Sequence, residues 1–338
     1  MNDALAVIVA ATLLLAVAAY STAGGVDFGA GIWDLLAGRG ERSREARELI
    51  DHAMAPVWEV NNVWLVLAIV ICWTGFPALF QAVFLNLYPF FTLALIGLIL
   101  RGAFFAFRHI SGGPRERRIA DLVFGLSSVL TPFFFAACLG AIASGRVTAP
   151  EPTMPVWEVL LAPMPIAFGL VSLAATAFSG ATFLVGDARR HNLGLVDHFR
   201  RRAIASALAL IAVGTLALGA IWLQRAALLA AMFTTAALPL TLAAIVITPV
   251  VAWLLWRRVF VIYRVLTVAA VGSLVGAWGL AQAPYLLPGQ LTIAQAAAPE
   301  ATDVLLVVVA LGVALVIGPA IGLLIYLDQK DLLESSEA

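Results

Sequence analysis

The sequence predicts an all-α integral membrane protein with about nine transmembrane helices. Hydrophobic residues make up 62% of the 338 residues and charged residues only 12%, and a soluble domain of this length could not cover so much apolar surface. Apolar runs long enough to cross a bilayer recur along the chain, and Lys and Arg are concentrated in alternate connections between them. We therefore expect a single polytopic membrane domain over residues 1–338.

A helix needs about 20 consecutive apolar residues to cross the hydrocarbon, and nine such runs are present. They occupy residues 4–23, 60–80, 81–100, 119–144, 157–185, 203–223, 237–256, 260–281 and 303–327. Because the second and third runs are joined tightly through Phe76 and Pro77, they are expected to form an antiparallel pair. The stretch 224–236 could extend either neighbouring span. The acidic tail, residues 328–338, is expected to be flexible.

The distribution of basic residues predicts the orientation in the membrane. If the spans alternate in direction, all but two of the 20 Lys and Arg fall on one side, and only Arg146 and Arg225 fall on the other. By the positive-inside rule, the N-terminus is then outside and the C-terminus is cytoplasmic. An even number of spans would destroy this segregation. Residues 41–53 are charged on one face, with Leu49 and Ile50 on the other, and are expected to lie along the cytoplasmic interface.

Several function classes are excluded by composition and motif. The formal charge balances to zero, so the chain presents no basic field for nucleic acid. Cys72 and Cys138 both lie in apolar runs and suggest no disulfide framework. The sequence lacks a P-loop, a His-Glu-x-x-His motif, a nucleophile elbow and a dinucleotide-binding fingerprint. The segment Met1-Asn2-Asp3 carries no Lys or Arg, so the first apolar run is expected to be a retained span, not a signal peptide.

No redox centre is expected in this chain alone. Haem or a metal ion in a membrane bundle requires His, Cys or Met ligands that project from the spans. The four histidines lie instead in the charged cytoplasmic connections, at His52, His109, His191 and His198. We therefore expect no catalytic residue and no metal ligand in this chain.

Polar residues gather at the cytoplasmic ends of the first two spans. Glu59, Asn61 and Asn62 open the second span, where Glu59 and Asn62 share a helix face because they are three residues apart. Asp27 directly follows the first apolar run, between glycines that let other backbone come close. An ionisable residue near the bilayer is by default a functional candidate.

These carboxylates allow two interpretations. Two acids in a partly desolvated site can pass protons along water chains, which would make Asp27, Glu59 and Asn62 a proton entry route from the cytoplasm. Alternatively, both acids could cap helix N-termini, where a carboxylate offsets the dipole. Arg101, at the end of the third span, could pair with an acid or snorkel to the surface.

Supporting roles are also possible for the neighbours of these groups. Trp58 and Trp64 are expected to anchor the second span at the interface, and Asn61 lies between them. A proton-coupled secondary transporter that uses Asp27 and Glu59 would be an alternative function, but it requires a polar site at the midplane of the membrane. No midplane charge is visible. A third alternative is a purely structural partner in which the acids act as caps.

Four stretches resemble subunit II of cytochrome bd quinol oxidase, and the resemblance is closest to the short form of Bacillus-like enzymes. They are GVDFGAG (25–31), PVWEVNNVW (56–64), RGAFFAF (101–107) and PYLLP (284–288). The resemblance covers nearly the whole chain in length, span number and motif order. It implies nine helices arranged as two four-helix bundles plus one extra helix, in the bacterial plasma membrane.

The resemblance also implies a function. Members of this family pair with a haem-bearing subunit I, which holds haem b and haem d and the quinol-oxidising loop. The complex takes electrons from quinol, reduces dioxygen to water in aerobic respiration, and draws protons from the cytoplasm without pumping them. Acidic residues at the positions of Asp27 and Glu59 are implicated in proton delivery, and Glu59 replaces the Asp of some members. A structural quinone, a small accessory subunit and membrane lipid are further partners that the resemblance leaves open.

Overall fold

The computed structural model describes residues 2–38, 40–54, 58–110, 113–234 and 236–329. Some side chains next to these gaps and in the second half of the last helix are also not described. The elements in this part of the chain are α1 (Asn2–Leu35), α2 (Glu41–Met54), α3 (Trp58–Gly75), α4 (Pro77–Ile110), α5 (Pro114–Ser144), α6 (Val156–Leu160), α7 (Pro163–His191), η1 (Leu193–Leu195), α8 (Val196–Thr234), α9 (Leu238–Trp256), α10 (Tyr263–Gln282), β1 (Tyr285–Leu287), β2 (Leu291–Thr292), α11 (Ile293–Ala296) and α12 (Glu300–Gln329). The tail that was expected to be flexible lies almost wholly outside this part.

The fold is all-helical apart from one short hairpin, as the hydropathy predicts. Among the described residues, α1, α4, α5, α7, α8, α9 and α10 are long and apolar enough to cross a membrane. The apolar part of α3, Asn61–Gly75, is shorter, and α12 is a further helix of 30 residues. Each of the nine runs expected from the sequence overlaps one of these helices. The number of crossings and their orientation remain predictions.

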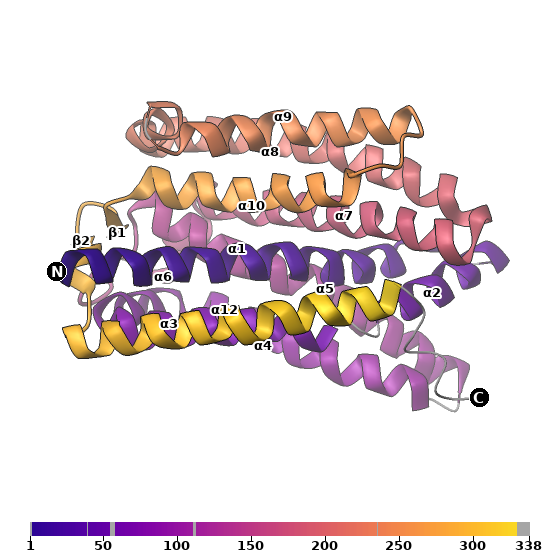
Figure 1. The fold of residues 1–338 in the computed structure, drawn as a ribbon, viewed down its shortest axis with the longest axis horizontal. Helices are drawn as coiled ribbons and strands as arrows, with labels where there is room; N and C mark the ends of the chain where they lie inside the picture. Colours follow the sequence, from indigo (N-terminus) through magenta and orange to yellow (C-terminus); the bar gives the residue numbers. More distant parts are fainter. Residues whose placement is uncertain (1, 39, 55–57, 111–112, 235, 330–338) are drawn as a thin grey trace.

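The long helices run roughly along one axis and form two neighbouring groups (Figure 1). Helices α7, α8, α9 and α10 pack against one another, and α1, α3, α4 and α5 form the second group. Helix α12 lies against α1 and α3, while α1 also contacts α7 and α10 and so joins the groups. Helix α2 lies across the end of the bundle where α1 finishes (Figure 1). We call this the arginine-rich end.

Helix α2 is the amphipathic segment predicted for residues 41–53. Its apolar residues Leu49 and Ile50 are buried in the same core as Phe178 of α7. Most of its charged residues are exposed, whereas Arg47 and Asp51 are partly buried. At the opposite end of the bundle, β1 and β2 form an antiparallel hairpin next to the start of α1 (Figure 1). This hairpin contains Tyr285–Leu287, part of the motif at 284–288.

Several boundaries differ from those expected, and two of them show how the helices pack or break. Helix α1 does not end near residue 23 but continues to Leu35, because glycines in this part of α1 allow close packing. A Cβ atom on Gly29 would lie 2.8 Å from Cα of Gly180 in α7, so two backbones meet here and no side chain fits between them. The stretch 224–236 extends α8 as far as Thr234, with a local break at Arg225 (φ −146°, ψ 62°).

Candidate functional site

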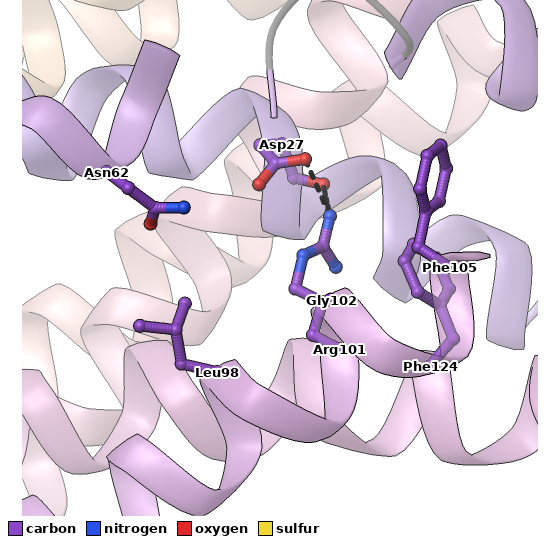
Figure 2. Close-up of a pocket in the computed structure, with 7 residues that line it drawn as sticks. All are labelled: Asp27, Asn62, Leu98, Arg101, Gly102, Phe105 and Phe124. Atoms are coloured by element: carbon purple, nitrogen blue, oxygen red, sulfur yellow. Dashed lines mark hydrogen bonds and ion pairs between the residues drawn. The ribbon is translucent and has the colours of Figure 1, made fainter. Parts of the chain in front are cut away.

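Asp27 lies inside α1, and its carboxylate forms a buried ion pair with Arg101 of α4. The distance from Arg101 Nη2 to Asp27 Oδ1 is 2.6 Å, and the same nitrogen donates to the backbone carbonyl of Asp27 at 2.9 Å. Both side chains are about 95% buried. Figure 2 shows the two side chains pointing toward each other across the space between the helices.

The remaining surface of the Arg101 guanidinium is also occupied by protein. Nη1 donates to the Ser128 hydroxyl of α5. The rings of Phe28 and Phe124 lie 4.8 and 4.5 Å from its central carbon, a cation–π arrangement that further stabilises a desolvated cation. Gly31 provides the room, because a Cβ there would overlap Ser128 and Arg101. The site is therefore built from α1, α4 and α5 around one guanidinium.

These contacts decide two alternatives that the sequence leaves open. Arg101 does not snorkel to the surface, because an acidic partner compensates its charge inside the bundle. Asp27 does not cap a helix, since it lies well inside a continuous α1. The expectation that Asp27 follows the first span is therefore wrong, and the close backbone approach expected from its neighbouring glycines is confirmed at Gly29.

A small cavity adjoins the ion pair. It is lined by Asp27, Asn62, Leu98, Arg101, Gly102, Phe105 and Phe124 and measures about 30 Å³, which is room for about two water molecules. Figure 2 shows the Asn62 carboxamide on the side of the cavity opposite Phe105. The structure thus brings together three of the residues predicted for this site: Asp27, Asn62 and Arg101.

The other predicted residues belong to the first turns of α3. Asn61 is 2% exposed and its Oδ1 has no hydrogen-bond partner among the described residues. Its amide nitrogen lies close to Gly24 of α1. Trp64 is partly buried. The backbone of Trp58 and Glu59 begins α3, but their side chains lie outside the described residues, so the directions of the indole and the carboxylate stay predictions.

A second buried ion network lies toward the arginine-rich end and was missed by the sequence reasoning. Arg108 Nη1 contacts Asp34 Oδ2 at 3.2 Å, and its other nitrogens lie 3.0 Å from Asp51 and 3.6 Å from Asp121. Arg47 of α2 pairs with the other oxygen of Asp34 at 3.2 Å. The Asp34 side chain is fully buried.

The signal that could have revealed this network is a spacing. Asp34 follows Asp27 by seven residues on α1, and Arg108 follows Arg101 by seven on α4. Seven residues are close to two helical turns, so each pair repeats on the same face of its helix. Two parallel helices with matched spacings then place the second acid beside the second arginine.

Possible metal ligands are scattered among the described residues. No group of three or more His, Cys, Asp or Glu side chains among them could hold a metal ion. His52 and His191 stack edge to face, with ring centroids 4.6 Å apart, at the arginine-rich end. The side chain of His109 lies outside the described residues.

Fold and site together define a helical, multi-pass membrane subunit with a buried polar centre. The family model for cytochrome bd terminal oxidase subunit II matches residues 5–327, so the chain belongs to that family. The resemblance found in its motifs is thereby confirmed. Membership in this family and the apolar helices place the protein in the bacterial plasma membrane as a multi-pass protein.

Individual relatives agree with this assignment. The chain is 25% identical over 210 residues to cytochrome bd-I ubiquinol oxidase subunit 2 of Escherichia coli, which is 61% of this chain and 53% of that protein. It is 27% identical over 129 residues to a putative cytochrome bd menaquinol oxidase subunit II of Bacillus subtilis, which is 38% of this chain and 36% of that protein. These alignments thus span about half of the Escherichia coli protein and about a third of the Bacillus subtilis protein.

A solved structure extends the likeness to nearly the whole fold. The structure of bd oxidase from Geobacillus thermodenitrificans matches with a TM-score of 0.80, covering 96% of this chain and 98% of that one. The sequence identity is 23%. At this identity the match shows the fold alone, and the roles of individual residues must be argued from this chain.

Proposed function

We propose that the chain is the non-haem subunit of a quinol:oxygen oxidoreductase of the bd type. In this proposal the complex takes electrons from quinol and reduces dioxygen to water. Subunit I holds haem b and haem d, while this chain supports it and supplies protons from the cytoplasm. The observation that carries the proposal is the buried pair Asp27–Arg101 beside a water-sized cavity, in a chain of this family.

The proposed proton route begins at Glu59. Glu59 precedes Asn62 by three residues on α3, so the two positions share a helix face. Water in the cavity would connect the Asn62 amide to the Asp27 carboxylate. Asp27 then passes the proton toward subunit I, and Arg101 holds its carboxylate in place through Nη2.

The proposal includes an orientation of the chain in the membrane. The charged residues of the Asp34 network and the arginines of α2, α5 and α8 lie at one end of the bundle. By the positive-inside rule that end is cytoplasmic. Glu59 begins α3 at this end, so the route starts where the protons are taken up.

The transporter alternative is left without support by the family assignment. A purely structural role for the acids is the competing hypothesis, and a neutral variant distinguishes the two. Gln has nearly the same shape as Glu and keeps hydrogen-bonding capacity but cannot carry a proton. The Glu59→Gln complex is therefore expected to keep its haem absorbance and to reduce oxygen more slowly with a quinol donor.

The matched control is Glu48→Gln, which removes an exposed acid of α2 at the same end of the bundle. It should leave turnover unchanged. Equal turnover of the Glu59→Gln and wild-type complexes would eliminate the relay role. Loss of haem together with activity would favour the structural role. A purified complex without haem d absorbance would overturn the oxidase assignment itself.

A further inference from the structure

A second cavity lies at the arginine-rich end, where the start of α8 meets the end of α1 and the start of α2. Its volume is about 440 Å³, large enough for a small ligand. Three arginines from two helices line it, together with one acid, a histidine and an indole. These residues are Arg42, Arg201, Arg202, Asp197, His198 and Trp33.

The charge in this cavity is not balanced within the described part of the chain. Asp197 is the one acid of the lining, and its two oxygens already accept from Arg200 at 2.9 Å and from Arg258 at 3.0 Å. No ion pair with a described carboxylate is found for the three arginines of the lining. Three guanidinium groups therefore line one cavity without a carboxylate partner of their own, and this arrangement favours the binding of an anionic ligand.

Two of these guanidinium groups are held in place by the protein. The central carbon of Arg202 lies 5.5 Å from the centre of the Trp33 ring, and its Nη1 contacts Nε2 of His198. Nη2 of Arg42 donates to the carbonyl of Gly194 at 3.3 Å. Arg202 is also partly buried. A ligand thus meets arginines that have already lost part of their conformational freedom, which lowers the cost of binding.

The cavity continues into an apolar surface on α8. Ala205 lines its edge, and Leu208 and Leu216 follow along the same helix with 59% and 73% of their surface exposed. The candidate span that contains them, Leu193–Thr234, has 42 residues. Because α8 breaks at Arg225, residues 196–224 form its first continuous part, which is about 44 Å long and exceeds the hydrocarbon thickness of about 30 Å. Its first turns therefore reach the level of the lipid headgroups.

We propose that this cavity binds the headgroup phosphate of an anionic phospholipid, whose acyl chains lie along the exposed face of α8. Basic pockets between transmembrane helices bind such headgroups through the same chemistry. Arg42, Arg201 and Arg202 contact the phosphate oxygens, and Trp33 borders the glycerol region. Because free inorganic phosphate offers the same oxygens, the acyl chains distinguish the two sources. This assignment depends only on the membrane location of the chain.

The test uses the purified complex, stripped of lipid in detergent and titrated with phosphatidylglycerol, phosphatidylcholine or inorganic phosphate. Retained lipid is counted by native mass spectrometry. The variant Arg42→Gln/Arg201→Gln removes two charges of the cavity but spares Arg202, which packs against Trp33. Its matched control, Arg117→Gln/Arg118→Gln, removes two exposed charges of α5 at the same end of the bundle.

Each arginine near an anionic lipid contributes on the order of 1 kcal/mol, so losing two should weaken phosphatidylglycerol binding roughly 30-fold. The control should bind as the wild type does. Equal retention of phosphatidylcholine and phosphatidylglycerol would overturn the proposal, as would equal loss in both variants. Displacement of phosphatidylglycerol by millimolar phosphate would show that the cavity binds a soluble anion instead of the lipid, and would overturn the proposal. An unchanged melting temperature without lipid would verify that the variants are folded.

Discussion

The buried pair Asp27–Arg101 makes a quantitative prediction about stability. The substitution Asp27→Asn keeps the shape of the side chain but leaves the Arg101 guanidinium without its counter-charge. Breaking a buried pair in this way costs about 3–5 kcal/mol. Arg101 retains two acceptors, the carbonyl of residue 27 and the Ser128 hydroxyl, so the cost should be near the lower end, about 3 kcal/mol.

This cost converts into a melting temperature. With an unfolding entropy of about 2.1 cal/mol/K per residue, the melting temperature should fall by about 4 °C if the 338 residues of this chain unfold as one unit within the complex. Arg101→Gln leaves a buried carboxylate instead and should lose at least as much. The double variant Asp27→Asn/Arg101→Gln contains a neutral pair of similar volume, so it should lose less than either single variant.

Thermal unfolding of the purified complex, at one scan rate and in one detergent, measures all three variants. The pair Arg44–Glu41 is the control, since its side chains are 70% and 83% exposed at 3.7 Å. Its removal should shift the melting temperature by less than about 1 °C. A double variant that loses the sum of the two single losses would show that the two charges are not coupled and would refute the reasoning.

Two further comparisons of variants test the helix packing and the second ion network. Gly29→Ala should destabilise the complex by several kcal/mol because its Cβ would enter the backbone of α7. The control Gly214→Ala, with no atom within 4 Å of its Cβ, should be neutral. Equal melting temperatures of the two variants would contradict the α1–α7 contact. Arg108→Gln should cost about 3–5 kcal/mol because Asp34 is fully buried. Arg264→Gln, whose pair with Asp187 is about one-fifth exposed, should cost less, and Arg44→Gln almost nothing; any other order of these three melting temperatures would contradict the dependence on burial.

The sequence was a good guide to the helices and a poor guide to their ends. Hydropathy locates a span because apolar residues dominate it, but α1 continues for twelve residues past Ala23 through Gly, Asp and Trp. Intrinsic propensity favours an interruption at Gly24 and Gly25. Packing against α7 at Gly29 overrides this preference, since tertiary contacts supply most of the stability of a helix. Apolar runs cannot reveal that contact.

The candidate site was predicted in part. A carboxylate near the membrane is costly, which identifies Asp27 from the sequence, and the spacing of three residues from Glu59 identifies Asn62. The sequence does not reveal the partner of Arg101. An arginine at the end of a span can either extend to the membrane surface or pair with an acid inside the bundle, and both arrangements have the same local sequence. The choice depends on which helices are neighbours, and the sequence does not contain that information in a local form.

The two ion networks show how local spacing and helix packing combine. Asp27 pairs with Arg101 and Asp34 with Arg108, and both pairs join residues 74 apart in the chain. Seven residues rise about 10.5 Å along a helix, so α1 and α4 remain in register over that distance. Such a register requires the helices to run in the same direction, which they do when a single crossing, α3, separates them. The second pair thus follows from the first once the helices are known to be parallel. It extends the line of buried carboxylates from the cavity toward the arginine-rich end.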